Sequence, residues 1–302
     1  MRSVLALLAN WQDHPQRRDA EDLVLHVLKR DRLWLRMQKD SLIQQTLTTD
    51  ELSLINAHLQ RLAEGEPLAY ILGSQEFWSL QLKVTVDTLI PRPDTERLVE
   101  LALEKMNNAQ GRALDLGTGS GAIALALKHS RPAWEITAVD QSPDALAVAH
   151  CNGAELGLTI HWRQGNWFEA LRPVSESGFG SRSECNSDSE SFRAEFPRFD
   201  VIVSNPPYID EQDEHLPDLT HEPLSALVAA DHGLADLHRI IAEAPDWLAI
   251  GGWLLLEHGH DQGAAVRSLL SQCGYAAIET LQDYGGNDRV SRGRYDDNHA
   301  RV

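Results

Sequence analysis

The chain has little cysteine. Its 302 residues contain three, Cys151, Cys185 and Cys273, and their spacing fits neither a disulfide framework nor a zinc site. Widely separated thiols in an odd number are typical of proteins from a reducing compartment. We therefore expect reduced cysteines, no metal site and a cytoplasmic protein.

Long hydrophobic runs are also missing. No stretch reaches the roughly 18 apolar residues that a membrane-spanning helix needs. The apolar run within residues 1–9 is too short for a signal peptide, and polar residues follow it directly. We expect the first helix of the fold there, and no association with a membrane.

Basic residues are outnumbered by acidic ones. The chain has 27 lysines and arginines against 45 aspartates and glutamates, which gives a net charge of −18 and a pI near 5.1. Because nucleic acids are held mainly through their phosphates, this balance argues against direct nucleic-acid binding, although a local basic patch stays open. The hydrophobic content of 42% is ordinary for a globular protein, and the length suggests about two domains.

Residues 1–66 carry helical patterns only. Thr48-Thr49-Asp50-Glu51 is a capping box, and the apolar residues that follow it recur at helical spacing. We expect a small helical bundle. Its charged faces are typical of solvated surface, but the module as a whole is expected to recognise the substrate. In residues 67–88, apolar and polar side chains alternate from Leu80 to Val86, which predicts a β-hairpin linker.

Residues 89–302 alternate between strand and helix patterns, which is typical of an α/β fold with a mainly parallel, doubly wound sheet. Asp94 or Thr95 is placed to cap the first helix of this part. Residues 175–195 are rich in serine and acidic residues, so we expect a flexible insertion there. The seven predicted strands are 113–116, 134–140, 159–163, 199–204, 252–257, 276–281 and 289–295.

A glycine-rich loop follows the first of these strands, with the sequence Asp115-Leu116-Gly117-Thr118-Gly119-Ser120-Gly121-Ala122. Glycines there permit a tight turn and a close approach of a ligand to the backbone. Asp140 ends the next strand, where a carboxylate can accept both hydroxyls of a ribose. The loop also fits the relaxed dinucleotide pattern G-x-G-x-x-A, so a nicotinamide cofactor remains an alternative. Asp115, close to where a cofactor ammonium group would lie, favours S-adenosyl-L-methionine.

The segment Asn205-Pro206-Pro207-Tyr208 follows a short apolar strand. Its Asn205 side-chain oxygen and Pro206 carbonyl can each accept one N–H of a planar amino group, while the Tyr208 ring covers the flat face. Two prolines after a strand can also be only a rigid turn. The glycine loop upstream is what favours the interpretation as a catalytic site.

Together these motifs resemble the HemK/PrmC family, the glutamine-N5 methyltransferases of release factors. The resemblance covers nearly the whole chain except the serine-rich insertion. It implies a class I methyltransferase fold, with a Rossmann-like seven-stranded sheet whose last strand is antiparallel. Asn166 departs from the acidic residue that similar proteins often have before the tryptophan at Trp167. The stretches that carry the resemblance are 89–96, 115–121, Asp140, 205–209, 222–227 and 257–259.

The resemblance also implies the reaction: transfer of a methyl group from S-adenosyl-L-methionine to the side-chain nitrogen of the glutamine in the Gly-Gly-Gln motif of class I peptide chain release factors. We expect a monomer. Alternatives are a ribosomal-protein glutamine or the amino group of a DNA base as acceptor. The implied catalytic residues are Asn205, Pro206 and Tyr208, and Pro207 joins them in substrate binding; the implied cofactor-binding residues are Asp115, Gly117, Thr118, Gly119, Ser120, Gly121, Asp140, Trp167 and Asn205.

Overall fold

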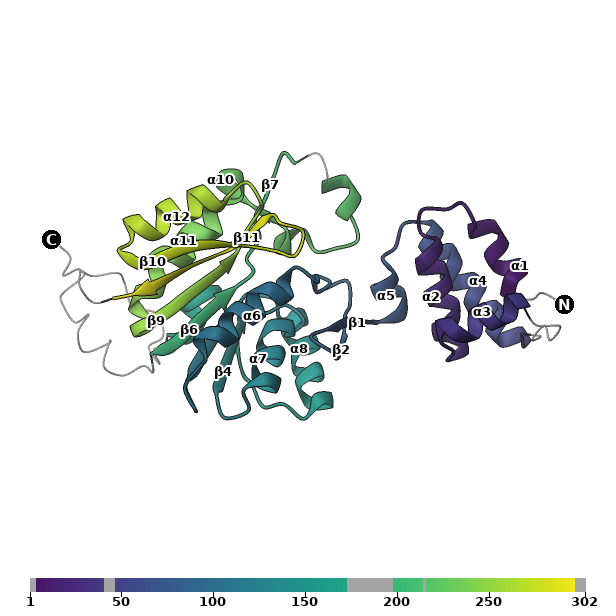
Figure 1. Ribbon diagram of the computed structural model, residues 1–302, viewed down its shortest axis with the longest axis horizontal. Helices are drawn as coiled ribbons and strands as arrows, with labels where there is room; N and C mark the ends of the chain where they lie inside the picture. Colours follow the sequence, from purple (N-terminus) through teal and green to yellow (C-terminus); the bar gives the residue numbers. More distant parts are fainter. Residues whose placement is uncertain (1–3, 41–46, 173–197, 214–215, 297–302) are drawn as a thin grey trace, which may run out of the picture. The chain divides into compact units, whose positions relative to one another are not determined.

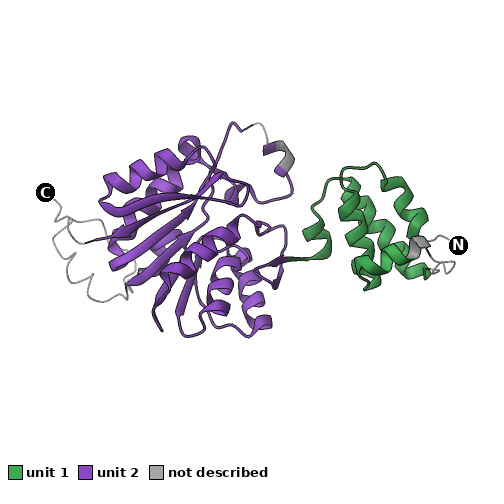
Figure 2. Ribbon diagram, viewed as in Figure 1, with its two compact units in different colours: residues 1–75 green, residues 76–302 purple. Residues whose placement is uncertain are grey.

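The computed structural model describes residues 4–40, 47–172, 198–213 and 216–296. The predicted insertion at 175–195 lies outside these residues. The chain divides into two compact units, residues 1–75 and residues 76–302 (Figures 1 and 2). Within the described residues, no helix has both the length and the apolar character that crossing a membrane requires.

The first unit is helical and has its own core. Apolar side chains from its helices, among them the fully buried Leu23 and Ile55, form one hydrophobic cluster. The capping box is confirmed, because Thr48 accepts from the Glu51 backbone N–H and Glu51 accepts from that of Thr48. The elements are α1 (Val4–Leu8), η1 (Ala9–Trp11), α2 (Arg17–Leu28), α3 (Arg32–Asp40), α4 (Thr49–Ala63) and α5 (Leu68–Leu72).

The short helix α5 was not predicted from the sequence. It lies in the range 67–88 that we assigned to a hairpin linker, and its Ile71 packs into the core of the helical unit. Gly73, with φ of +69°, ends this helix in the left-handed region. A hairpin of β1 (Ser74–Phe77) and β2 (Leu80–Lys83) follows.

The second unit contains a seven-stranded sheet in the order β10-β11-β9-β6-β3-β4-β5. The neighbours from β9 to β5 are parallel, whereas β11 runs antiparallel to both β9 and β10. The predicted fold class, with its antiparallel last strand, is confirmed. The strands of the sheet are β3 (Arg112–Leu116), β4 (Glu135–Asp140), β5 (His161–Gln164), β6 (Phe199–Ser204), β9 (Leu248–Glu257), β10 (Tyr275–Gln282) and β11 (Asp288–Tyr295).

Helices cover both faces of this sheet (Figure 1). Along β6, Val201 and Val203 pack in a cluster with α6 and α7, and Ile202 packs in a second cluster with α11 and α12. Both faces of the strand are therefore buried, as its continuous apolar run predicts. The helices are α6 (Thr95–Lys105), α7 (Ala122–Ser130), α8 (Pro143–Leu156), α10 (Ala230–Gly233), α11 (Ala235–Glu243) and α12 (Gly263–Gln272).

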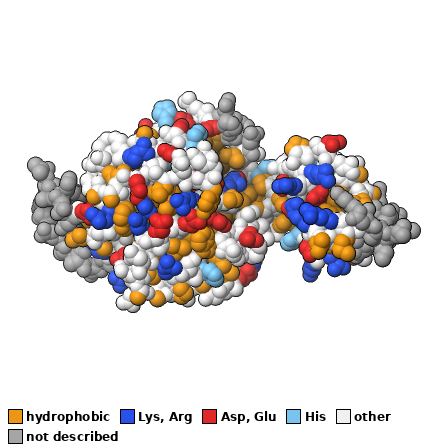
Figure 3. All heavy atoms as spheres, in the orientation of Figure 1, with side chains coloured by type: hydrophobic (Ala, Val, Ile, Leu, Met, Phe, Trp, Pro, Cys, Tyr) orange, Lys and Arg blue, Asp and Glu red, His pale blue; other side chains and the backbone are white. Residues whose placement is uncertain are grey.

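Short elements complete the second unit. A two-stranded sheet pairs β7 with β8 in parallel, and three-residue to five-residue 3₁₀ helices occupy several connections. On the face shown in Figure 3, acidic and basic side chains of this unit are interspersed. These elements are η2 (Trp167–Leu171), β7 (Ile209–Asp210), η3 (Leu216–Leu219), η4 (Leu224–Ala226), β8 (Val228–Ala229) and η5 (Ala244–Asp246).

The carboxyl ends of three adjacent strands bring the sequence motifs together. In the parallel register, Leu116 of β3 lies opposite Ser204 of β6 and Val139 of β4. The Ser204 hydroxyl donates to the Leu116 carbonyl at 2.7 Å. The glycine loop, Asp140 and Asn205 therefore leave the sheet side by side, at the edge where open α/β sheets bind ligands.

Candidate active site

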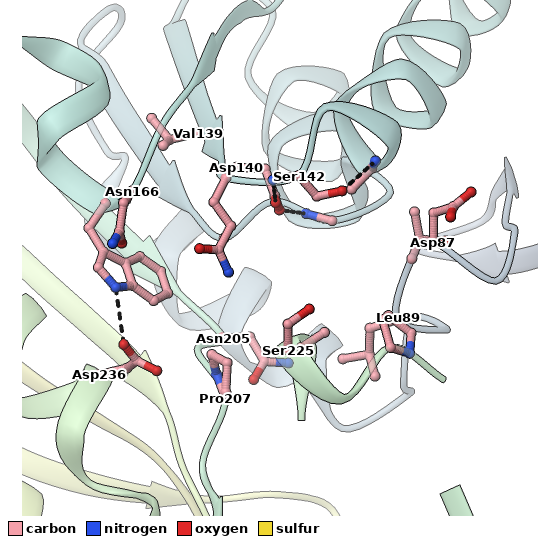
Figure 4. A pocket seen from close by; sticks show the side chains of 18 of the residues that line it. Asp87, Leu89, Val139, Asp140, Ser142, Asn166, Asn205, Pro207, Ser225 and Asp236 are labelled. Carbon is pink, nitrogen blue, oxygen red and sulfur yellow. Dashed lines mark hydrogen bonds between the residues drawn. The ribbon is translucent and has the colours of Figure 1, made fainter. Parts of the chain in front are cut away.

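A cavity of about 290 Å³ lies at this edge of the sheet. It is lined by the glycine loop, the ends of β4 and β6, and parts of the segments 86–89 and 223–226. Asp140 and Asn166 face Asn205 and Ser225 across it (Figure 4). Of the twelve residues that the resemblance implies for catalysis and binding, six line this cavity: Gly117, Gly119, Asp140, Trp167, Asn205 and Pro207. In the part of the chain that the structure describes, the remaining six do not line the cavity: Asp115, Thr118, Ser120, Gly121, Pro206 and Tyr208.

The glycine loop is held against the end of β4. The backbone N–H groups of Gly117 and Thr118 both donate to the Val139 carbonyl at 2.9 Å. Gly117 has a φ of +72°, and a Cβ atom there would lie 3.2 Å from the ring of Trp167. Glycine is required at this position both for the left-handed backbone and for the close approach of the indole.

Asp140 links the loop to the next helix. Its Oδ2 accepts the Gly119 backbone N–H at 2.8 Å, and its Oδ1 accepts that of Ser142 at 2.9 Å. Burial raises the pKa of this carboxyl, while the backbone hydrogen bonds oppose that rise. A carboxylate offers about four lone-pair sites, so Asp140 can still accept a hydrogen bond from a ligand in the cavity.

Asp115 lies beneath the glycine loop and is fully buried. Its Oδ2 accepts the Thr118 hydroxyl at 2.6 Å and the Ala124 backbone N–H at 3.2 Å. Its Oδ1 is buried and has no hydrogen-bond partner among the described residues. Burial raises the pKa of Asp115 to about 7. Asp115 thus holds the loop in shape, and one of its oxygens retains an unused capacity to accept.

Trp167 is fixed by a residue that sequence reasoning missed. Its backbone has a φ of +49°, an uncommon conformation for a residue other than glycine. Its indole N–H donates to Oδ1 of Asp236 at 3.1 Å (Figure 4). Asp236 belongs to α11 and lines the cavity. No pattern in the sequence connects two residues that lie 69 positions apart.

Asn205 is the first residue after β6. Its Nδ2 donates to Oγ1 of Thr95 at 3.2 Å, so its Oδ1 is not needed for that contact. Pro206 is buried, and Tyr208 donates its hydroxyl hydrogen to Oε1 of Glu257 at 3.4 Å. Burial raises the pKa of Tyr208, with the nearby Glu257 adding to that rise, so the phenol stays protonated.

Glu222 connects the segments 89–96 and 222–227, which were identified from the sequence as motifs without assigning functional roles to their residues. Its side chain is buried, accepts the Ile90 backbone N–H at 3.2 Å and pairs with Arg92. Glu222 therefore connects the stretch 89–96 to the segment whose Pro223 and Ser225 line the cavity. Glu222 was quoted in a motif, but its role could not be assigned without the fold.

Comparisons with known proteins agree with this geometry. A relative from Vibrio cholerae, named release factor glutamine methyltransferase, is 48% identical over 92% of this chain and 89% of its own length. A protein of the same name from Escherichia coli is 47% identical over 92% of both chains. One from Xylella fastidiosa is 44% identical over 97% of this chain and 98% of its own. The chain belongs to the release factor glutamine methyltransferase family. Members of this family, like this chain, are methyltransferases.

Family models agree with this membership, and solved structures agree with the fold. Residues 3–73 match the PrmC N-terminal domain, and residues 95–176 match the methyltransferase small domain. A methyltransferase from Pyrococcus furiosus aligns with a TM-score of 0.50 at 15% identity, covering 80% of this chain and 99% of its own. The hMettl16 catalytic domain aligns with a TM-score of 0.52 at 14% identity, covering 86% and 87%. At these identities the structures support the fold alone, and the class I methyltransferase fold implies the use of S-adenosylmethionine.

Proposed function

We propose that this protein transfers a methyl group from S-adenosyl-L-methionine to the side-chain amide nitrogen, N5, of the glutamine in the Gly-Gly-Gln motif of class I peptide chain release factors. The names of the relatives support the acceptor. The observation that carries the chemistry is Asn205, which lines the cavity beside the glycine loop with its NH₂ group already engaged. Its Oδ1 is available to an incoming amide.

The cavity residues fit the cofactor. Asp140 offers carboxylate lone pairs for ribose hydroxyls, and Trp167 offers a flat ring for the adenine. Asp115 does not line the cavity, but it stands directly before the glycine loop, and its carboxylate with the unpartnered Oδ1 complements the positive charge of the cofactor's ammonium group. Thr118, Ser120 and Gly121 act through the shape of the loop. Asn166, which lines the cavity, offers an amide where an acidic residue is frequent in similar proteins.

When bound, the cofactor supplies an electrophilic methyl group, so the protein must chiefly align the acceptor with it. An amide nitrogen is a poor nucleophile because its lone pair is delocalised. Asn205 Oδ1 and the Pro206 carbonyl accept the two N–H hydrogens and favour the positive charge that develops on nitrogen. Tyr208 restrains the amide plane, and Pro207 stiffens the loop. No dedicated base is required, because the proton can leave after the transfer.

The test is transfer of a labelled methyl group from S-adenosyl-L-methionine to parallel acceptors. These are a class I release factor, the same factor with its Gly-Gly-Gln glutamine replaced, ribosomal proteins, and duplex DNA. Label on the intact factor and none on the replaced one is the expected result. Label on ribosomal protein or DNA alone would overturn the acceptor, and an absence of cofactor binding would return the glycine loop to its dinucleotide interpretation.

The variant Asn205→Ala completes this experiment. We expect turnover to fall at least about 100-fold, the order found when one stabilising hydrogen-bond partner of a transition state is removed. Its affinity for S-adenosyl-L-methionine, measured by calorimetry, should stay near that of the wild type. A large loss of cofactor binding would show that Asn205 acts mainly on the cofactor instead.

A further inference from the structure

The Asn-Pro-Pro-Tyr loop is held at its two ends by different elements. At its entry, Nδ2 of Asn205 donates to Oγ1 of Thr95, the first residue of α6. At its exit, the carbonyl oxygen of Tyr208 accepts a hydrogen bond from Nε2 of Gln262 at 3.0 Å. The two prolines between these ends have a fixed φ, so the loop has little freedom of its own. Contacts at the exit therefore also influence where the Pro206 carbonyl lies.

Gln262 occupies the N-cap position of α12. Like Asp94, one of the two residues expected to cap α6, it makes no side-chain cap of its helix. Its Oε1 instead accepts the Gly259 backbone N–H at 2.8 Å, and its Nε2 donates to the carbonyls of Tyr208 at 3.0 Å and His232 at 3.2 Å. Both amide hydrogens are used, and a flipped amide would place its oxygen against two carbonyl oxygens. The three partners therefore determine the orientation of the amide.

The segment that shares Gln262 with the loop has an unusual backbone. Asp231, His232 and Gly233 are three consecutive residues in the left-handed region, with φ of +56°, +54° and +78°. Residues other than glycine rarely adopt this conformation, and it persists where the surrounding structure holds it. A Cβ atom at Gly233 would lie 2.0 Å from the carbonyl oxygen of Tyr208. This left-handed turn therefore places its backbone directly against the exit of the loop.

We propose that Gln262 is a positioning residue for the methyl acceptor, and that it holds the Tyr208 carbonyl between the start of α12 and the left-handed turn 231–233. Gln262 is not among the described residues that line the cavity, so it acts through the loop. A shift of the exit is passed through the two prolines to the Pro206 carbonyl. This inference rests on the proposed function, in which that carbonyl and Asn205 hold the glutamine amide. A misplaced acceptor slows the transfer step and leaves cofactor binding unchanged.

The first test replaces Gln262 by Glu in the full chain. The carboxylate keeps the length of the side chain and can accept from Gly259, but it cannot donate to the two carbonyls. With saturating release factor and S-adenosyl-L-methionine, kcat should fall about 10-fold to 100-fold, as expected for a misplaced reactant. The Kd for S-adenosyl-L-methionine, measured by calorimetry, should stay near that of the wild type.

The matched control is Gln272→Glu at the other end of the same helix. Gln272 is exposed, and its amide donates to Ser268 of the same helix. A negative charge is favourable near the start of a helix and unfavourable near its end, so an effect of charge on α12 would harm Gln272→Glu more than Gln262→Glu. We expect the opposite order, with Gln272→Glu retaining the kcat of the wild type.

A second pair of variants displaces the loop from the other side. Gly233→Ala and Gly251→Ala both place a side chain on a left-handed backbone, since Gly251 has a φ of +81°. A Cβ atom at Gly251 would meet no atom of a described, non-neighbouring residue within 4 Å, whereas at Gly233 it would push against Tyr208. In Gly233→Ala kcat should therefore fall about 10-fold or more, and in Gly251→Ala it should not.

The outcomes separate this inference from the proposed function. If Gln262→Glu retains the kcat of the wild type, or if its only defect is cofactor affinity, the positioning role is overturned while Asn205→Ala still tests the function. Equal losses of kcat in Gly233→Ala and Gly251→Ala overturn it as well. Gln262 is partly exposed, so the two glutamine variants decide the matter even if Gly233→Ala does not fold. If the wild type does not methylate the release factor, the proposed function itself fails.

Discussion

At Asp115, burial and hydrogen bonding act on one carboxyl in opposite directions. Removal from water raises its pKa to about 7, while the Thr118 hydroxyl and the Ala124 backbone N–H lower it. The negative charge of Asp140 nearby adds to the rise. In the absence of ligand, the carboxylate form therefore carries a cost that a bound cation would offset.

This cost predicts how stability depends on pH. The folded protein keeps a proton on Asp115 up to a pKa of about 7, whereas the unfolded chain releases it near the ordinary pKa of an aspartate, 3.8. The free energy of unfolding should therefore decrease as the pH rises between these values. Asp115→Asn cannot ionise, and its Oδ1 can still accept from Thr118 and Ala124. In this variant, the free energy of unfolding should decrease by a few kcal/mol less between pH 3.8 and about 7, because each unit of pKa difference corresponds to about 1.4 kcal/mol.

Denaturant unfolding of the cofactor-free protein at several pH values measures this difference. In Asp115→Asn, the dependence of the free energy of unfolding on pH should be weaker than in the wild type but still present, because burial also raises the pKa of Glu257 to about 7. Glu257→Gln is thus the matched comparison. Equal slopes in the wild type and Asp115→Asn would mean that Asp115 ionises as readily in the folded protein as in the unfolded chain.

Between elements, the buried Glu222 ties the turn before α6 to the segment at the cavity. Replacing it by Ala leaves the Ile90 N–H without its acceptor and Arg92 without its partner. We expect the free energy of unfolding to fall by about 1–3 kcal/mol, the range for an unsatisfied buried polar group. Turnover should fall as well, because Pro223 and Ser225 lose their support.

The matched control is Glu135→Ala, which breaks the pair of Arg112 and Glu135. Those side chains are 47% and 61% exposed, so the loss should stay below about 1 kcal/mol. Thermal or chemical unfolding and the transfer assay compare the two variants. If Glu222→Ala lowers the free energy of unfolding and the turnover no more than Glu135→Ala does, the contacts of Glu222 do not stabilise the two segments.

The elements differ in how far their sequences reveal them. All seven strands of the large sheet were predicted, and for the central strands the local signal is a short apolar run bounded by turns. The capping box was also predicted, since its partners lie three residues apart. The five-residue helix α5 was missed, because so few residues show no helical period and its Ile71 is stabilised by distant packing.

The candidate site divides in the same way. The glycine loop, Asp140 and Asn205 could be predicted because each follows a recognisable strand, and the parallel register then brings them together. Their supporting residues could not be predicted. Thr95 contacts Asn205 across 110 positions, and Glu222 reaches Ile90 across 132. Such partners depend on the packing of separate elements, for which a single sequence has no local signal.

At the scale of the whole molecule, the two units have separate cores and are expected to have separate tasks. Every described residue that lines the cavity belongs to residues 76–302. The helical unit, which we propose recognises the release factor, has the fully buried Ile55 in its core. Damage to that core should therefore impair substrate recognition without altering the cofactor cavity.

The variant Ile55→Ala tests this separation. Removing a buried side chain of this size should lower the stability of the helical unit by about 2–5 kcal/mol. On heating, methyl transfer to the release factor should then fail at a temperature where S-adenosyl-L-methionine still binds. The control is Leu54→Ala on the same helix, whose side chain is 47% exposed and whose loss should leave both temperatures near those of the wild type. Transfer that persists as long as the cofactor binds would show that the helical unit is dispensable for recognition, because the cavity alone would then suffice to select the acceptor.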